Sequence, residues 1–165
     1  MKNIDMDGSV ARSFSLFLLR IFIGWHLLFE GLIKVMDPSW TAHGFLKGSK
    51  WIFSDFFLMI ANNSALLGIV DLLNQWGLVL IGLALFIGVF TRIAAISGVV
   101  LLMLYYVCMP PFMGLDYAST TEGSYMIVNK NLIEVAALLI LSLFSAGEHF
   151  GLDLLRRRRT GKLAF

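Results

Sequence analysis

Hydrophobic residues run through this chain in long stretches separated by short polar breaks. A membrane-spanning helix needs about 20 mostly apolar residues, and the stretch from Trp76 to Met109 is too long for one crossing. We expect the chain to turn at its polar break, Thr91-Arg92, and to end the next helix before Pro110-Pro111, because proline removes a helical donor. The pattern predicts an all-α membrane protein, a four-transmembrane-helix bundle forming one domain over 1–165, with helices at about 14–36, 71–90, 92–109 and 127–146.

Two longer connections, 37–70 and 110–126, join these helices on the outer side of the membrane. Within the first, residues 45–70 have the pattern of an amphipathic helix lying on the surface, with Trp40 and Trp51 as interfacial anchors. A fifth crossing is the alternative. It is less favoured because polar residues interrupt the segment: Lys47, Lys50, Asp55, Asn62 and Asn63.

Composition agrees with a membrane location. Hydrophobic residues make up 58% of the chain, charged residues 15%, and the mean hydropathy is +0.81, whereas soluble domains carry roughly 25% charged residues. Basic residues crowd the tail over 147–165, and most Lys and Arg fall inside if both termini are cytoplasmic. We therefore expect a multi-pass protein of the cell inner (cytoplasmic) membrane, with its first segment retained, the lipid bilayer as its surroundings, and no nucleic-acid partner.

One face of the first predicted helix is polar. Arg20, His26, Glu30 and Lys34 share an arc of about 120° at helical spacing. Ionisable groups at membrane depth are costly and usually face the protein interior. Because the other predicted helices also carry polar residues towards their outer ends, the sequence predicts a polar pocket in the outer half of the bundle.

The candidate catalytic residues of this pocket are His26, Glu30 and Glu134. Imidazole titrates near neutral pH, so His26 is suited to exchange protons with a bound molecule. The candidate ligand-binding residues are those that bring charge, amide groups or rings to the same region: Arg20, Lys34, Trp76, Tyr105, Tyr106, Lys130 and Asn131. Other interpretations stay open, since an ion pair can simply fix packing, a histidine can be a packing residue, and tyrosine and tryptophan form interfacial belts. Arg20, the deepest charge, is also interpreted as a structural tie to the fourth helix.

Several kinds of chemistry are not predicted. Cys108 is the only cysteine, which excludes a disulfide, a CxxC redox pair or a cysteine metal cluster within one chain. His43 and His149 fall on opposite sides of the predicted membrane from each other, so no three-histidine site is expected. The sequence also lacks a phosphate loop, a GxSxG elbow, a haem-attachment motif and an HExxH motif. No metal or haem site is predicted, and a redox role would need another carrier.

Several residues and segments together have the order and spacing of a known family: Arg20, Gly24, Glu30-Gly31 and Lys34, the segments 82–94 and 129–134, Gly151-Leu152-Asp153, and Trp40 to Leu46. On these residues the chain resembles the DoxX/DoxD family of small four-helix membrane proteins, and Trp40 to Leu46 is similar to a loop of its DoxD-like branch. That branch is associated with thiosulfate:quinone oxidoreductase. The resemblance therefore implies an integral membrane subunit of a quinone-linked oxidoreductase that acts on sulfur compounds, with quinone as acceptor and a soluble or membrane redox partner as electron donor.

Other functions stay open. The chain is alternatively a non-catalytic membrane anchor or assembly partner for a soluble enzyme on the outer face. A small-solute transporter is less favoured, because four helices without an evident inverted repeat leave little room for alternating access. A homo-oligomer is compatible with either of the first two functions.

Overall fold

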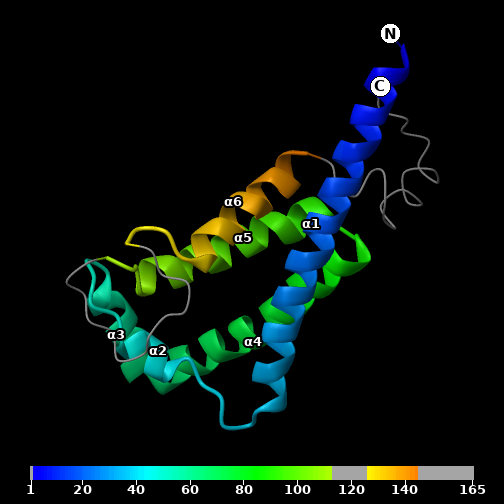
Figure 1. Cartoon of the computed structure of the whole chain (residues 1–165). Coiled ribbons are helices and arrows are strands. Elements are labelled where there is room, and N and C mark those ends of the chain that lie inside the picture. Colours follow the sequence, from blue (N-terminus) through cyan, green and yellow to red (C-terminus); the bar gives the residue numbers. More distant parts are fainter. Residues whose placement is uncertain (1, 113–125, 145–165) are drawn as a thin grey trace.

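In the computed structural model, which describes residues 2–112 and 126–144, every regular element is an α-helix. Three of them contain segments long and apolar enough to cross a membrane: Val10–Met36, Ser64–Ile87 and Thr91–Cys108. The helices are α1 (Lys2–Met36), α2 (His43–Lys47), α3 (Ser54–Asn62), α4 (Ser64–Ile87), α5 (Thr91–Cys108) and α6 (Lys130–Leu143) (Figure 1). The end of the fourth predicted helix, the end of the predicted loop 110–126 and the basic tail 147–165 lie outside the described residues.

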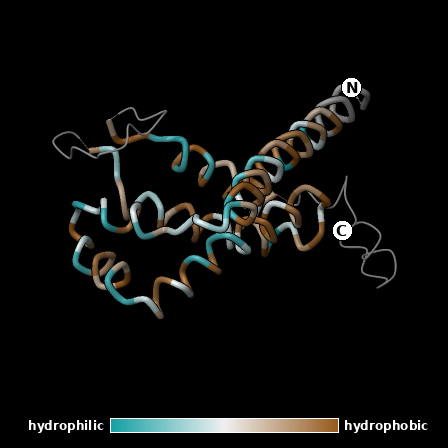
Figure 2. The backbone as a smooth tube through the Cα atoms, turned by 90° about the horizontal axis from the view of Figure 1, so that it is seen from below, coloured by the Kyte–Doolittle hydropathy of each residue, from teal (hydrophilic) through white to brown (hydrophobic). Residues whose placement is uncertain are grey.

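The long helices pack in two pairs. α1 packs along α4, and α5 packs along α6, while the N-terminal end of α1 projects beyond the other helices (Figure 1). Hydrophobic positions recur along the outward sides of these helices, as expected for surfaces that meet lipid (Figure 2). The core between the pairs is built from small and branched apolar residues: Ile23, Leu27, Leu78, Ile81, Leu85, Ala94, Ala95, Leu102, Val135, Leu138 and Leu141.

Glycines allow the backbones of α1 and α4 to touch. A Cβ added at Gly24 would lie 2.7 Å from the Phe86 backbone nitrogen, and one at Gly31 would lie 2.6 Å from the Val79 nitrogen. A Cβ at Gly82, from the other side of the contact, would overlap the backbone of Leu28. Such close approach is typical of helix pairs in membranes, where van der Waals contact supplies much of the attraction.

The helix boundaries differ from the predicted ones at both ends of α4. They also differ at α1, which begins at Lys2 rather than at 14, and at α6, which spans Lys130–Leu143 rather than 127–146. α4 begins at Ser64 rather than at 71, because the Asn63 side chain caps it by accepting hydrogen bonds from the Ala65 and Leu66 nitrogens. α4 ends at Ile87 rather than at 90, because Gly88 adopts a left-handed conformation with φ of 79°. Thus the turn between α4 and α5 comes slightly earlier than Thr91-Arg92.

The segment predicted as one amphipathic surface helix contains two short ones, α2 and α3. Helices of 5 and 9 residues are too short to cross a bilayer, so this segment does not supply a fifth crossing. A second apolar cluster packs it onto α5: Ala42, Leu46, Phe57, Ala61, Cys108 and Met109. α2 and α3 thereby form a cap over one end of the bundle, opposite the projecting end of α1 (Figure 1); whether this cap lies on a membrane surface stays a prediction.

We predict that Gly82→Ala lowers the free energy of unfolding by about 1–3 kcal/mol, because the added methyl group forces α1 and α4 apart. Gly77→Ala is the matched control on the same helix, since no atom lies within 4 Å of its added Cβ. Unfolding of the purified protein in detergent, followed by circular dichroism, measures both. Equal stability of the two variants would contradict the close α1–α4 contact.

Candidate functional site

A cavity of about 290 Å³ lies where α1, α4, α5 and α6 meet beneath the segment that contains Trp40 and Phe45. Each of the four helices contributes a polar side chain to its wall, so the predicted gathering of polar groups is present. The residues that line it are His26, Leu27, Glu30, Lys34, Trp40, Thr41, Ala42, Phe45, Asn74, Leu78, Leu102, Tyr105, Lys130, Asn131 and Glu134.

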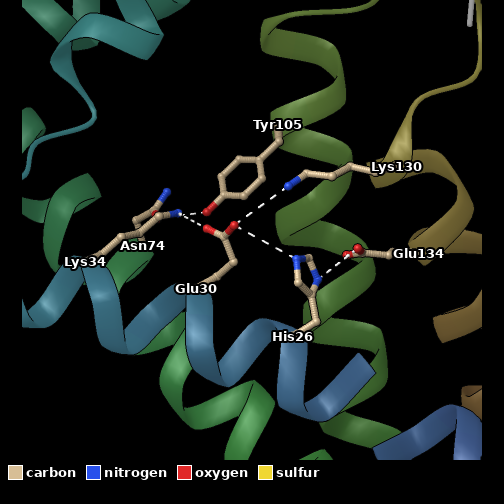
Figure 3. A network of polar contacts seen from close by, with 7 residues as sticks. All are labelled: His26, Glu30, Lys34, Asn74, Tyr105, Lys130 and Glu134. Carbon is tan, nitrogen blue, oxygen red and sulfur yellow. Dashed lines mark hydrogen bonds and ion pairs between the residues drawn. The ribbon is translucent and has the colours of Figure 1, made fainter. Parts of the chain in front are cut away.

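His26 links α1 to α6. Its Nδ1 atom lies 2.9 Å from Oε1 of Glu134, which is hydrogen-bond distance, although the ring N–H is not well aligned with that oxygen. On the other side of the ring, Nε2 lies 4.0 Å from Oε1 of Glu30 (Figure 3). The imidazole thus stands between two carboxylates, an arrangement that orients the ring.

The second carboxylate oxygen of Glu134 has no partner. This atom, Oε2, is buried and makes no hydrogen bond with any of the described residues. A buried carboxylate oxygen without a partner is costly. It is therefore able to accept a hydrogen bond from a molecule in the cavity, or to hold a proton.

Glu30 is the centre of the charge network. Besides His26, its carboxylate has Lys34 Nζ at 3.8 Å and Lys130 Nζ at 3.7 Å (Figure 3). At these distances the charged groups form ion pairs rather than short hydrogen bonds. With His26 neutral, the two carboxylates and two ammonium groups of the cavity balance, which lowers the cost of placing them in a membrane.

Lys34 is held by neutral groups as well. Its ammonium donates a hydrogen bond to Asn74 Oδ1 at 3.1 Å, and it lies 5.1 Å from the centre of the Trp40 ring and 5.3 Å from that of Tyr105. The Tyr105 hydroxyl donates to the same Asn74 oxygen at 2.8 Å. Asn74 therefore joins α1, α4 and α5 through one atom.

The segment above the cavity is fastened to α4. The backbone nitrogen of Ala42 donates to the Asp71 carboxylate at 2.8 Å. This contact holds Trp40 over Lys34, and it brings Phe45 against Tyr105, with ring centres 5.8 Å apart. Two aromatic rings of this segment thus form part of the cavity wall.

Most of the predicted site residues lie together in this cavity, but three do not. Arg20 is buried near the other end of the bundle against Gly88, where the C-terminal end of α4 favours a positive charge. Trp76 is exposed, because it lies two residues after Asn74 and so points away from the cavity. Tyr106 donates its hydroxyl to the Ile127 carbonyl at 2.8 Å and steadies the segment before α6.

Sequence reasoning did not select Asn74, Trp40, Thr41 or Phe45 as site residues. The sequence did indicate Asn74, because it is a polar residue one turn after Asp71 within an apolar helix, and its face continues to Leu78. Nothing in the sequence pattern indicated that Trp40, Thr41 and Phe45 would lie at the site. Their place depends on how the connection folds back onto α4, which is a tertiary contact.

No protein-family model, no curated protein and no solved structure matches this chain. The resemblance to the DoxX/DoxD family therefore stays a prediction that rests on the residues named for it.

We predict that Asn74→Leu lowers the free energy of unfolding by about 1–3 kcal/mol, because it removes the acceptor shared by Lys34 and Tyr105. Gln75→Leu is the control, since the neighbouring side chain is not part of the cavity wall. Unfolding by sodium dodecyl sulfate in mixed micelles gives both values. If Asn74→Leu is no less stable than Gln75→Leu, the shared acceptor does not stabilise the bundle.

Proposed function

We propose that this protein is the integral membrane subunit of a quinone-linked oxidoreductase and that the cavity binds the quinone head group. The observation that carries the proposal is the imidazole of His26 between two carboxylates in the wall of a cavity that also presents aromatic rings. Reduction of a quinone to a quinol takes up two electrons and two protons. A suitable site therefore needs a protonatable group beside a space for a flat ring.

The spacing of the polar groups supports this choice. His26 and Lys34 are eight residues apart on α1, so their Cα atoms are about 12 Å apart along the helix axis. Their side-chain nitrogens lie closer together than this, because both contact the carboxylate of Glu30. A six-membered ring with an oxygen at each end, hydrogen-bonded at both, is of comparable length. Lys34 then donates to one carbonyl oxygen and His26 to the other, while Trp40, Phe45 and Tyr105 contact the ring faces and edges.

His26, Glu134 and Glu30 have different roles in the proposed proton transfer. Glu134 holds the Nδ1 side of His26, so that the Nε2 side is left to exchange a proton with the bound oxygen. Glu30, which lies 4.0 Å from Nε2 and has longer ion-pair distances to Lys34 and Lys130, is the neighbouring group from which Nε2 takes up a proton. In this proposal a soluble or membrane redox partner delivers the electrons, and by the resemblance a sulfur compound is their source.

The proposal includes the topology of the chain. In this proposal α6, which is described over 14 residues, supplies the fourth crossing, so both termini are cytoplasmic and the cavity lies in the outer half of an inner-membrane protein. The cap of α2 and α3 then lies on the outer face.

A non-catalytic anchor is the second candidate. The observation in its favour is that the cap exposes large apolar side chains, among them Ile52, Phe53, Phe56 and Met59. A soluble enzyme on the outer face would find an apolar contact there. In that case the cavity network would serve stability alone.

We predict that a decyl-chain benzoquinone quenches the fluorescence of the purified protein saturably, because Trp40 lines the cavity. Trp40→Phe removes this quenching, and Trp76→Phe, which changes an exposed ring outside the cavity, keeps it.

Glu134→Gln weakens binding of the same quinone about ten-fold, because an amide oxygen accepts a hydrogen bond from the His26 ring less strongly than a carboxylate does. Asp55→Asn, the same change on the cap, has no effect. Quenching that does not saturate, or that survives Trp40→Phe, would exclude this site and favour the anchor.

We further predict opposite labelling of two single cysteines placed in a Cys108→Ala background. With the proposed topology, Lys47→Cys on α2 reacts with a membrane-impermeant maleimide added to right-side-out vesicles. Arg92→Cys, in the first turn of α5, reacts only in inverted vesicles. Reaction of both cysteines from one side would contradict the proposed arrangement.

A further inference from the structure

We infer that the cavity opens sideways, between α1 and α6, into the hydrocarbon layer, and that its ligand is an amphiphile drawn from the bilayer. The flat head of the ligand occupies the cavity, and its hydrocarbon chain lies along the seam between the two helices. The identity of the head group rests on the proposed function, whereas the direction of entry rests on the geometry alone.

On the four helices, the more exposed part of the cavity wall lies on α1 and α6. The side chains of His26 and Glu30 are 37% and 40% exposed, and that of Lys130 is 54% exposed. On the α4 side, Asn74 and Leu78 are buried. Thr41 and Phe45 of the connecting segment are exposed as well. Between the helices, the opening is therefore on the α1–α6 side.

This is also where the helices pack least. α1 packs closely along α4, and α6 along α5, whereas α1 and α6 have few close backbone contacts. Polar side chains bridge the seam instead, through His26 with Glu134 and Glu30 with Lys130. A seam bridged by side chains can admit a chain between them without breaking a close backbone contact.

The opening lies at the depth of acyl chains. The apolar span of α1, Val10–Met36, has its middle near residue 23. His26 is then about 5 Å and Glu30 about 10 Å from the middle, because a helix rises 1.5 Å per residue. Half of the hydrocarbon layer is about 15 Å thick, so both residues lie within it.

The segment that contains Trp40 and Ala42 lies across the end of the cavity nearer the water and is fastened by the hydrogen bond to Asp71. Thr41 and Phe45 of this segment are partly turned to the surroundings. The sides of the lateral opening are apolar, with Ile33 on α1 and Ile133 on α6 exposed by 53% and 58%. Apolar edges around a polar interior suit a ligand that is apolar at one end and polar at the other.

The size of the cavity leads to the same conclusion. At about 290 Å³ it is at the lower limit of ligand pockets, which hold roughly 300–1,000 Å³. A substituted ring fills such a space, and a long chain attached to it has to lie outside. Lys130, Glu134 and Ala137 follow one another at i, i+4 and i+7, so a chain that runs from the cavity towards the middle of the bilayer passes Ala137.

The test is Ala137→Phe with Ala136→Phe as matched control, since Ala136 is exposed on another side of α6. Two probes with the same ring are compared by fluorescence quenching in nanodiscs, one with a decyl chain and one with a methyl group instead, both expressed as membrane mole fractions. We expect Ala137→Phe to weaken binding of the decyl probe about ten-fold and to leave the methyl probe unchanged. Ala136→Phe is expected to change neither. An equal effect on both probes, or none, would overturn lateral entry.

A second measurement does not depend on the folding of these variants. A decyl-chain quinone with a diazirine at the chain end, bound to the wild-type protein, should label α1 near Phe22 and α6 near Ile140. Labelling of 37–47 would show entry from the water side instead. If the wild-type protein binds neither probe saturably, the proposed quinone function fails; if it binds both but the label lies on 37–47, only lateral entry fails.

Discussion

An ionisable side chain within a bilayer needs a partner, because the lipid offers no other means of lowering its charging cost. α1 carries three such groups on one side of its C-terminal half, and the other described side chains of α1 do not satisfy all of them. Glu134 and Lys130 on α6 and Asn74 on α4 supply what is missing. The relative placement of three helices follows from this requirement, and the cavity is the space enclosed by the pairs.

The close backbone contact between α1 and α4 brings the paired groups within reach of one another. Gly24 and Gly31 on α1 meet α4 where Gly82 also lacks a side chain, so Lys34 lies close enough to reach Asn74 directly. Larger residues there would move α1 outward and lengthen the contact between Lys34 and Asn74. The apolar core and the polar site are therefore not independent, since the same close contact determines both.

Helix content and the polar face of α1 could be predicted because each depends on local periodicity. The gathering of His26, Glu30, Glu134, Lys34, Tyr105, Lys130 and Asn131 followed from the expected depth of each residue in its helix. The rotation of each helix about its axis was harder to predict than the depth of its residues. For this reason Tyr105 and Tyr106 were both predicted in the site, although only Tyr105 lines the cavity. Trp40 and Phe45 were missed because their positions depend on a loop fastened by Asp71, and the early start of α4 depends on a single capping residue, Asn63.

The bridges that span the cavity connect α1 with α6, two helices that are far apart in the sequence. Until α6 is in place, His26 lacks Glu134 and Glu30 lacks Lys130. Of the ion pairs of the cavity, only those within α1 can form before then. The complete network is therefore a late product of folding, because it requires both helices at once.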